Sequence, residues 1–542
     1  MPCILPEPRR ITFKEGNWRK SHLSHFSRDV RIGIHAPVGW RGPVSWLQKG
    51  LEHEQMFRVE DVSPEEADIV FEKRLPSGSL SGPKDDLLML GFQNEAYRIE
   101  VTPDRILIAA ASAHGASRAV ASLRQMLSGQ RARLELPCFV LEDEPSFAWR
   151  GMHFDCSRHF WCVDDVLRFI DLAALHKFNV FHWHLTDDQG WRLPVEGYPR
   201  LTDCAAWRDG TMVGHDCDRA TNPQDGIRHG GFYSHEDIRR VVAHAEARGM
   251  HVLPEIDVPG HVQALLTAYP EFGNTGLAPG VRTCWGISPH TLNLEPQTFE
   301  FLERVVDTLA ELFPFPLVHL GGDEAKTGEW MESPRIPERM AELGIPDVLG
   351  IQPFFTQRLV EMLAHHGRRM VGWDEIIEGK APDASAVVMY WRDSEKNAHA
   401  LDRKALECRN GLVLANWSKT YFDLYQEAGP GRDFEPLAIC GRLTLEDVYR
   451  WNPLARYPEA LATGVWGAQA QVWTEYIPNR PHLDYMVYPR ACALSQVLWR
   501  GADREDFPHF LSRLERHLPL LDRLGVAYRP SFPPPPDNTS QP

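Results

Sequence analysis

Two short runs of the sequence, His182–Arg192 and His319–Glu324, carry the residues best suited to chemistry. The first reads His-Trp-His-Leu-Thr-Asp-Asp-Gln-Gly-Trp-Arg and the second His-Leu-Gly-Gly-Asp-Glu. Each starts as an apolar β-type segment and then breaks into carboxylates, aromatics and glycine. In a barrel of parallel strands, catalytic groups project from the C-terminal ends of the strands. Aromatic faces beside carboxylates suit the cleavage of a glycosidic bond, because rings pack on the sugar while acids serve the glycosidic oxygen.

The adjacency of Asp323 and Glu324 constrains the chemistry further. Ordinary glycosidases hold two carboxyls about 5–5.5 Å apart for retention, or about 6.5–9.5 Å apart for inversion. Adjacent residues do not easily straddle a sugar ring, so we expect Glu324 to protonate the leaving oxygen and Asp323 to orient a nucleophile carried by the substrate. A 2-acetamido group fits, because its carbonyl oxygen can reach C1 and close an oxazolinium ring. Gly321 and Gly322 let the backbone leave the strand there.

The elements that must position these residues follow from Trp149 onward, where short apolar strands alternate with amphipathic helices. Helices are predicted at Asp164–Phe178 and at Ser234–Arg248, the second opening with a Ser-x-x-Asp capping sequence. The pattern predicts an α/β fold, a (β/α)8 TIM barrel with long loops. Its eight candidate strands are Trp149–Asp155, Asn179–Leu185, His251–Ile256, Leu317–Gly321, Arg369–Trp373, Ala386–Tyr390, Gly411–Ala415 and Val465–Val472.

The ends of all eight candidate strands carry acids, histidine, arginine or aromatic residues, which a purely structural barrel does not require. In chain order they are Asp155 and Arg158; Asp187, Asp188 and Trp191; Asp257 and His261; Asp323 and Glu324; Trp373, Asp374 and Glu375; Trp391; Trp417, Tyr421 and Asp423; Trp473 and Glu475.

The remaining segments divide the chain into further units. Residues 1–145 are predicted to form a small accessory α+β domain with an antiparallel-type sheet, and residues 146–502 the catalytic barrel. Residues 503–529 are a C-terminal helical segment packing on the barrel, with a helix at Asp506–Leu524 interrupted by Pro508 and Pro519. Residues 530–542 are a Pro-rich, disordered tail. Within the first unit, strands are expected at Ile69–Phe71, Tyr97–Val101 and Ile106–Ala110, and a helix at Ala113–Leu127.

Composition excludes several classes of partner. The 542-residue chain has a net charge of −16 and no run rich in Lys or Arg, which argues against nucleic acid. No apolar stretch reaches the roughly 18 residues of a membrane span, so no membrane is expected. The N-terminus lacks a basic segment followed by an apolar one. We expect a cytoplasmic protein as the sequence is written, and a periplasmic or secreted one if a signal peptide has been removed.

The ten cysteines are scattered and form no C-x-x-C pair, so neither a zinc ribbon nor a redox motif is predicted. Free thiols are the favoured interpretation. A disulfide such as Cys204–Cys217 is the alternative in an oxidising compartment.

Taken together, these motifs resemble those of bacterial β-N-acetylhexosaminidases of glycoside hydrolase family 20. The resemblance covers nearly the whole chain. Glu142–Phe160 is similar to the segment that leads into the family's barrel. His182–Arg192, Pro254–His261 (Pro-Glu-Ile-Asp-Val-Pro-Gly-His) and His319–Glu324 are similar to its core motifs. Residues 1–145 resemble its accessory domain.

The resemblance implies a role for each matching position. Asp323 would hold the acetamido nitrogen, Glu324 would act as general acid and then base, and Tyr421 would bind the acetamido carbonyl. Asp187 and His261 would tune Glu324, whose pKa must then be high enough to keep its proton near neutral pH. Only the Tyr421 segment departs from the family pattern, with Phe422 where leucine is expected. The implied substrate-binding residues are Arg158, Trp373, Trp391, Asp423, Trp473 and Glu475.

The implied activity is that of an exo-acting, retaining enzyme on terminal, non-reducing β-linked GlcNAc, with GalNAc left open. The implied partner is the glycan alone, the protein is a monomer or homodimer, and no cofactor or metal is implied. Three alternatives stay open: a lacto-N-biosidase-like enzyme that releases a disaccharide, a glycosidase specific for sulfated GlcNAc, and a barrel that binds glycans without cleaving them. The Arg158 and Glu475 pair argues for a monosaccharide-sized pocket.

Several other residues are better explained by structural roles. His182 and His184 share a strand face and suggest zinc, but no third ligand follows at metal spacing, so hydrogen bonding is favoured. Asp188 is interpreted as a loop-capping acid, and Asp374–Glu375 as a structural pair. Packing is favoured over sugar contact for Trp161, Trp183, Trp191 and Trp417.

Overall fold

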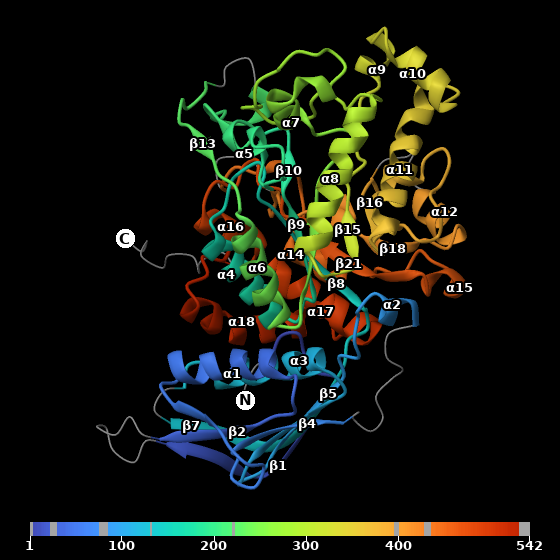
Figure 1. The fold of residues 1–542 in the computed structure, drawn as a ribbon. Helices are drawn as coiled ribbons and strands as arrows, with labels where there is room; N and C mark the ends of the chain where they lie inside the picture. The colour runs from blue at the N-terminus through green and yellow to red at the C-terminus, as the bar shows by residue number, and fades with distance from the viewer. Residues whose placement is uncertain are drawn as a thin grey trace, which may run out of the picture.

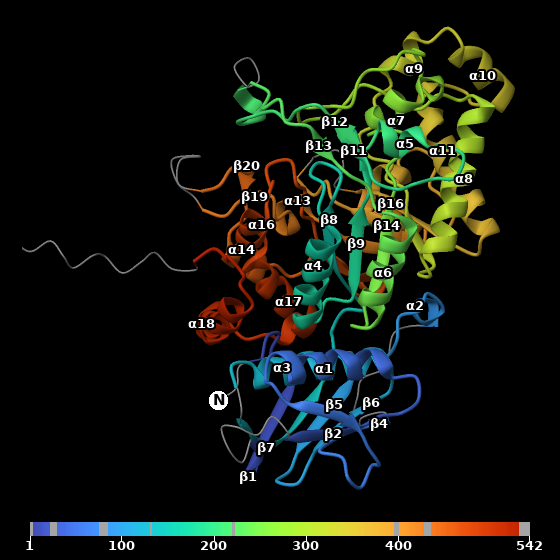
Figure 2. The same cartoon turned by 60° about the vertical axis from the view of Figure 1, so that its left-hand side comes forward.

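The computed structural model describes residues 4–21, 30–74, 85–130, 133–218, 223–394, 400–427 and 435–530. The predicted Pro-rich tail lies outside the described residues, apart from residue 530. A seven-stranded N-terminal sheet lies at one end of the molecule and a barrel at the other, with α1 (Arg41–His53) and α3 (Ala113–Leu127) between them (Figure 1). The turned view shows the same arrangement of sheet, helices and barrel (Figure 2).

The barrel is closed by eight parallel strands, as predicted. The two strands predicted with correct bounds are β8 and β16, and the other six differ only at their ends. The strands are β8 (Trp149–Asp155), β9 (Val180–His184), β14 (His251–Glu255), β15 (Leu317–His319), β16 (Arg369–Trp373), β17 (Val387–Tyr390), β18 (Gly411–Leu414) and β21 (Val465–Ala470). Their continuous burial fits a parallel sheet covered by helices.

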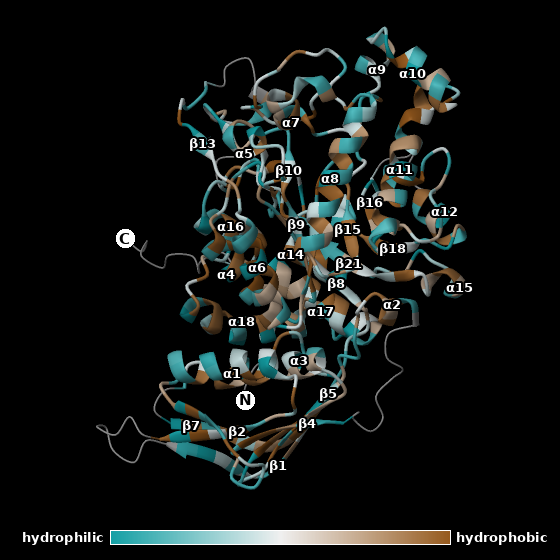
Figure 3. Cartoon of the chain, viewed as in Figure 1, coloured by the Kyte–Doolittle hydropathy of each residue, from teal (hydrophilic) through white to brown (hydrophobic). Residues whose placement is uncertain are grey.

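Helices surround the barrel, and several follow from local sequence signals. Ser234 caps α6 and forms a capping box with Asp237, as its spacing predicts. Figure 3 shows the larger helices alternating between hydrophobic and hydrophilic residues, as one buried face requires. The main barrel helices are α4 (Val163–Leu175), α6 (His235–Glu246), α8 (Pro296–Leu312), α11 (Ile351–His365), α12 (Leu401–Glu407), α14 (Leu445–Arg450), α16 (Arg480–Val487) and α17 (Arg490–Arg500).

Shorter elements lie in the loops that connect the barrel strands and helices. They are the helices α5 (Arg200–Asp203), α7 (Gln263–Ala268), α9 (Gly328–Glu332), α10 (Ile336–Leu343), α13 (Trp417–Thr420) and α15 (Glu459–Ala462), and the short strands β10 (Thr186–Asp187), β11 (Gly190–Trp191), β12 (Trp207–Arg208), β13 (His229–Gly230), β19 (Leu424–Tyr425) and β20 (Ile439–Arg442).

The N-terminal sheet is mixed rather than antiparallel throughout. Its order is β1-β7-β5-β6-β4-β2-β3, in which the pairs from β1 to β6 are antiparallel and those from β6 to β3 are parallel. The β2–β3 pair is parallel because α1 connects these two strands by a crossover. The strands are β1 (Arg10–Ser21), β2 (Arg31–His35), β3 (Arg58–Asp61), β4 (Ile69–Lys73), β5 (Tyr97–Val101), β6 (Ile106–Ala110) and β7 (Arg133–Asp143).

Buried charges join this sheet to the barrel. Asp143 at the end of β7 accepts hydrogen bonds from Lys177 (2.8 Å), Tyr97 (2.7 Å) and Trp499 (2.8 Å). Lys177 and Trp499 belong to the barrel, and all of these groups are buried. Because an unpaired buried charge is costly, this cluster fixes the base of the barrel on the accessory sheet.

The C-terminal helix α18 (Phe507–Arg523) corrects one prediction, because neither proline interrupts it. Pro508 lies in the first turn, where a missing N–H costs nothing, and Asp506 caps the helix through the N–H of His509. Pro519 lies inside the continuous helix. The helix contacts the barrel where His517 meets His176, with 3.0 Å between their Nε2 atoms. Among the described residues, no helix is long and apolar enough to cross a membrane.

Candidate active site

The acid pair follows β15 on a left-handed backbone that favours glycine. Gly321 and Gly322 have φ angles of 62° and 100°, and Glu324 itself has a φ of 50°. A Cβ atom on Gly321 would lie 1.7 Å from Oδ1 of Asp257, so no larger residue fits there. The two glycines thus turn the chain, as predicted, and bring both carboxylates to the C-terminal end of the barrel.

His261 links the acid pair to Asp187. Its Nδ1 lies 3.2 Å from Oδ1 of Asp187, and its Nε2 lies 3.5 Å from both Oδ2 of Asp323 and Oε2 of Glu324. His261 also has a left-handed backbone, with a φ of 52°. Strained residues of this kind persist where the surrounding structure holds them. The sequence predicted Asp187 and His261 as a pair beside Glu324, and the structure brings all three together.

The proton of this cluster resides on His261 rather than on Glu324. Burial lowers the pKa of His261, but the charges of Asp187 and Asp323 raise it well above its usual value. Burial raises the pKa of Glu324, but the hydrogen bond and charge of His261 lower it further, to below its usual value. The expectation of a raised Glu324 pKa is therefore wrong for the unliganded site. The physical reason is the adjacent imidazolium, which stabilises the carboxylate.

Asp257 is a site residue that the sequence placed at a strand end but gave no role. Its Oδ1 accepts from the N–H of Gly322 at 3.3 Å. Burial and the charge of Asp323 raise the pKa of Asp257 well above its usual value, which favours its protonated form. Burial raises the pKa of Asp323, while the charge of His261 and a hydrogen bond from Asp257 oppose this rise. In the sequence, only the position of Asp257, four residues before His261, indicated that Asp257 lies near the acid pair.

Arg158 is held by carboxylates on three sides. Its guanidinium lies 2.8 Å from Asp187, 3.2 Å from Asp155 and 3.8 Å from Glu475. Burial raises the pKa of Asp187, but the charges of Arg158 and His261 bring it well below its usual value. Asp187 is therefore ionised and joins the predicted sugar-binding arginine to the predicted catalytic histidine.

Asp423 supplies acceptors that the described part of the protein leaves unused. Both carboxylate oxygens of Asp423 are buried and lack a hydrogen-bond partner among the described residues. Burial and the charge of Glu475 raise the pKa of Asp423 well above its usual value. Unsatisfied buried polar atoms are rare in native proteins and require an explanation. Ligand hydroxyl groups would provide it.

Four aromatic residues surround the acids. The rings of Trp373 and Trp473 have centroids 5.9 Å apart, and those of Trp391 and Tyr421 are stacked at 6.3 Å. The guanidinium of Arg158 lies over the ring of Trp473 at 4.9 Å. The structure therefore gathers the predicted tryptophans and tyrosine around one end of the barrel. Trp161, Trp183 and Trp191 are buried in the packing, as expected.

The second acid pair, Asp374–Glu375, contacts Trp391, one of these four aromatic residues. The indole N–H of Trp391 donates to Oε2 of Glu375 at 3.1 Å, and Asp374 pairs with Arg392 at 2.7 Å. Burial and the charge of Asp374 raise the pKa of Glu375 well above its usual value. These contacts agree with the structural role that the sequence predicted for the pair. The residue that Glu375 holds is Trp391, a predicted sugar-binding residue.

Glu255 forms a buried hub beneath the site that the sequence did not reveal. Its carboxylate lies 2.6 Å from His184, 3.1 Å from His182 and 2.9 Å from His319, and it accepts from the indole of Trp373 at 2.9 Å. The charge of Glu255 overcomes burial and raises the pKa of His184 to about 10. His182 and His184 thus have the hydrogen-bonding surroundings that the sequence favoured.

A cavity of about 300 Å³ opens above these groups, and Arg158, His261, Glu324 and Glu475 are among its lining residues. The loop containing Trp285 and Ile287 borders it. Asp188 anchors that loop by accepting from the N–H groups of Ser288 (3.2 Å) and Gln263 (3.0 Å), which agrees with its predicted role.

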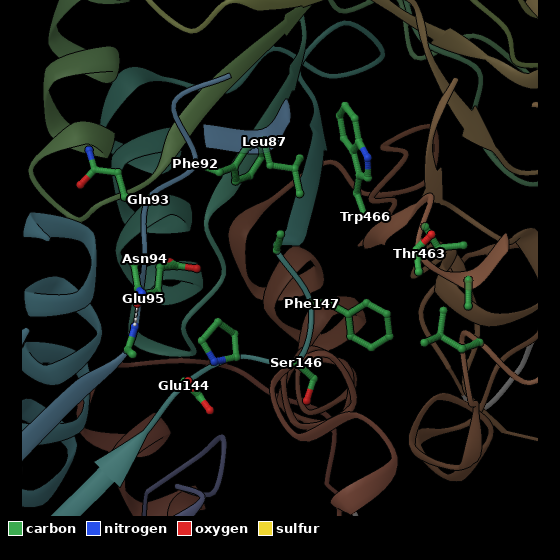
Figure 4. Close-up of a pocket in the computed structure, with 16 residues that line it drawn as sticks. Leu87, Phe92, Gln93, Asn94, Glu95, Glu144, Ser146, Phe147, Thr463 and Trp466 are labelled. Carbon is green, nitrogen blue, oxygen red and sulfur yellow. Dashed lines mark hydrogen bonds between the residues drawn. The ribbon is translucent and has the colours of Figure 1, made fainter. Parts of the chain in front are cut away.

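A second cavity of about 300 Å³ lies at the other end of the barrel, between Phe92, Phe147 and Trp466 (Figure 4). It borders the N-terminal ends of β8 and β21, whereas the catalytic groups of such barrels lie at the C-terminal ends. We therefore assign it no part in the chemistry.

The barrel and its acid-lined, aromatic C-terminal face define a glycosidase-type protein. The model of the glycosyl hydrolase family 20 catalytic domain matches residues 147–502, and that of the family's domain 2 matches residues 1–144. The chain belongs to glycosyl hydrolase family 20, a family of glycoside hydrolases.

Individual relatives agree. The chain is 34% identical over 461 residues to a beta-hexosaminidase from Porphyromonas gingivalis, covering 83% of this chain and 56% of the relative. It is 34% identical over 503 residues to a beta-hexosaminidase from Vibrio furnissii, covering 91% of this chain and 76% of that one. A family 20 exo-β-N-acetylglucosaminidase from Vibrio harveyi, solved with N-acetylglucosamine, has a TM-score of 0.81 at 31% identity, covering 98% and 78%.

Proposed function

We propose that the protein is an exo-acting, retaining β-N-acetylhexosaminidase that removes terminal, non-reducing β-linked GlcNAc or GalNAc through an oxazolinium intermediate. The observation that carries the proposal is the contact of Asp323 and Glu324 with one atom, Nε2 of His261, at 3.5 Å each. Two acids that meet on the same imidazole lie on the same side of a substrate. The nucleophile must then come from the sugar itself.

The proposed steps divide between the two acids. Glu324 donates its proton to the glycosidic oxygen as the acetamido carbonyl oxygen attacks C1. Asp323 accepts from the acetamido N–H and stabilises the positive oxazolinium, and the hydroxyl of Tyr421 donates to the carbonyl oxygen. Glu324 then takes a proton from the water that opens the ring. In the resting site His261 holds the proton 3.5 Å from Glu324, so the acid form of Glu324 arises by transfer from His261 or from solvent.

The exo specificity is supported by three polar residues. Arg158 and Glu475 line the cavity 3.8 Å apart, both act electrostatically on Asp423, and the unpartnered oxygens of Asp423 can accept from ring hydroxyls. Such a clamp fits one terminal sugar and argues against release of a disaccharide. The mass of the released product separates these two outcomes.

The first test compares aryl release from an aryl N-acetyl-β-glucosaminide with release from the matching aryl β-glucoside. We expect fast release from the first and none from the second, because only the first carries the acetamido nucleophile. Equal rates would overturn the proposal and point to an enzyme nucleophile. NMR of the first product formed should show the β-anomer, since retention places water on the original face.

The second test removes each acid as its amide. Asp323→Asn and Glu324→Gln should each lower kcat by roughly 10²–10⁴-fold, the usual contribution of an acid–base or charge-stabilising group. Glu324→Gln should slow poor leaving groups more than activated aryl ones, because only the poor ones need a proton. Glu332→Gln, an exposed acid on α9, is the matched control. Near-normal rates in both site variants would reject the mechanism.

A further inference from the structure

Two cysteines from distant parts of the chain meet at the rim of the candidate active site. The Sγ atoms of Cys217 and Cys440 lie 3.6 Å apart, although 223 residues separate them in the sequence. Both residues are exposed thiols. They line the same cavity as Arg158, Glu324 and Glu475. The sulfur beside Cys217 therefore belongs to Cys440, and not to Cys204, the partner considered from the sequence.

His215 determines what this pair can do. Its Nδ1 accepts from the backbone N–H of Cys217 at 3.1 Å, so a neutral ring carries its hydrogen on Nε2. That Nε2 lies 3.2 Å from the carbonyl oxygen of Ala438 and 3.6 Å from Sγ of Cys440. A metal ligand would need a lone pair on Nε2, whereas this ring presents an N–H there. This N–H can donate to the sulfur of Cys440 when that sulfur reacts as a thiolate, its nucleophilic form.

The distance between the sulfurs suits exchange chemistry. A disulfide bond requires about 2.05 Å, so the two sulfurs must approach each other by about 1.5 Å. Both residues stand on the rim, Cys217 in the single-turn 3-10 helix Asp216–Asp218 and Cys440 in the short strand β20. Rotation of their side chains, with small loop shifts, can supply this movement. Their exposure admits a small reagent.

We propose that Cys217 and Cys440 are a dithiol modification site that reacts with low-molecular-weight disulfides. The thiolate of Cys440 attacks one sulfur of the reagent and releases one thiolate, leaving a mixed disulfide. The thiolate of Cys217 then attacks Sγ of Cys440 and releases the second thiolate. The two cysteines are oxidised to one disulfide and the reagent is reduced to two thiols. The two protons lost by the cysteines pass through solvent to those products.

The cross-link would act on the predicted sugar-binding residues on both sides of the rim. The ring of His215 stacks on Tyr476 with centroids 4.8 Å apart, and Tyr476 directly follows Glu475. The N–H of Ile439, next to Cys440, donates to the carbonyl of Asp423 at 3.0 Å. A disulfide would thus tie the segments beside Glu475 and Asp423 together. We expect it to affect substrate binding more than the chemical step.

The experiment treats the full-length protein with oxidised glutathione, then counts free thiols and identifies linked peptides by mass spectrometry. We expect the loss of the two thiols at Cys217 and Cys440, one peptide pair joined by a disulfide, and full reversal by dithiothreitol. Cys217→Ser should stop at a single glutathione on Cys440. Cys204→Ser, which removes another exposed thiol, should still form the link.

The kinetic consequence, which rests on the proposed function, is a change in KM of about threefold or more with kcat within about twofold. An unchanged KM in the fully linked protein would overturn the effect on binding. Glutathione adducts on both cysteines, without a disulfide between Cys217 and Cys440, would overturn the proposed dithiol site. A zinc ion that stays bound through gel filtration and protects both thiols would also overturn it. The linked peptide is detected by mass spectrometry and does not depend on enzymatic activity. If the reduced protein lacked the proposed activity, the proposed function would fail while the dithiol site could still be tested.

Discussion

Glu255 accepts a hydrogen bond from Nδ1 of His184 at 2.6 Å, directly beneath the candidate active site. The other nitrogen of His184 lies 3.2 Å from Asp187, and Asp187 contacts His261. Burial raises the pKa of Glu255, but the charges of His319 and His184 bring it well below its usual value. Alternating charges therefore run from the barrel core to the acid pair, and the core charge supports the orientation of Asp187.

The first prediction removes that core charge without changing its shape. Glu255→Gln should lower kcat by roughly 10–100-fold, because Asp187 and His261 lose the imidazolium that positions them and small misplacements are costly in catalysis. The variant should keep its far-UV circular dichroism, and its pH–rate profile should shift because His184 no longer stays protonated. Glu303→Gln on the exposed side of α8 is the control. An unchanged profile would make Glu255 a packing residue only.

The second prediction concerns stability against pH. The pKa of His184 is raised to about 10 in the folded protein, against an ordinary value of 6.5. A raised folded pKa means that the stabilisation is fully present below pH 6.5 and is lost as pH rises through about 10. For a fully buried group the effect is on the order of a few kcal/mol.

Thermal unfolding of the wild type and of His184→Gln should therefore be compared from pH 6 to pH 10. The gap in Tm should be largest near pH 6 and shrink toward pH 10, because only the wild type has the His184 proton, which the folded state binds more tightly than the unfolded state. A gap that stays constant across the series would show that His184 is not an imidazolium in the folded state.

The barrel could be predicted because each strand is a short apolar run with a sharp polar end. Arg369–Trp373, for example, has the same bounds in sequence and structure. The accessory sheet was harder. Its edge strand β1 (Arg10–Ser21) is largely exposed and carries Lys14, Glu15 and Arg19, so no apolar pattern marks it. An edge strand is defined by its partner, here β7, which lies far along the chain.

The candidate site divides in the same way. Asp323, Glu324 and His261 belong to motifs in which an apolar strand ends in polar residues, and this pattern predicts a site at the strand ends. The structure places both acids within 3.5 Å of His261. The partners of Glu255, the raised pKa of Asp257 and the contact of Cys217 with Cys440 depend on distances between segments. A single sequence contains no record of such distances. The sequence predicted His261 beside Glu324 but not the direction of its effect, because the lowered pKa of Glu324 depends on the charges that surround His261.

The third prediction tests the support of Trp391. Burial and the charge of Asp374 raise the pKa of Glu375 well above its usual value, which favours the neutral form that glutamine imitates. Glu375→Gln should therefore leave KM within about twofold of the wild-type value. Glu375→Ala should raise KM by about tenfold, since the indole N–H of Trp391 loses its 3.1 Å acceptor. Steady-state kinetics on an aryl N-acetyl-β-glucosaminide decide this. Equal KM values for the two variants would remove the proposed role of the contact.

The last prediction separates two costs at Gly321. Gly321 and Gly344 have nearly the same left-handed φ, 62° and 68°, so alanine at either position bears a backbone strain of about 1 kcal/mol. At Gly344, the residue that ends α10, a Cβ meets no atom within 4 Å, whereas at Gly321 it would lie 1.7 Å from Oδ1 of Asp257.

Gly344→Ala should therefore lower Tm slightly and leave activity intact. Gly321→Ala should displace Asp257 and the acid pair, with a larger loss of Tm and a fall in kcat of at least about 100-fold. Thermal unfolding and kcat measured on both variants provide the comparison. If Gly321→Ala lowers Tm and kcat no more than Gly344→Ala does, the close approach of Gly321 to Asp257 does not position Asp323 and Glu324.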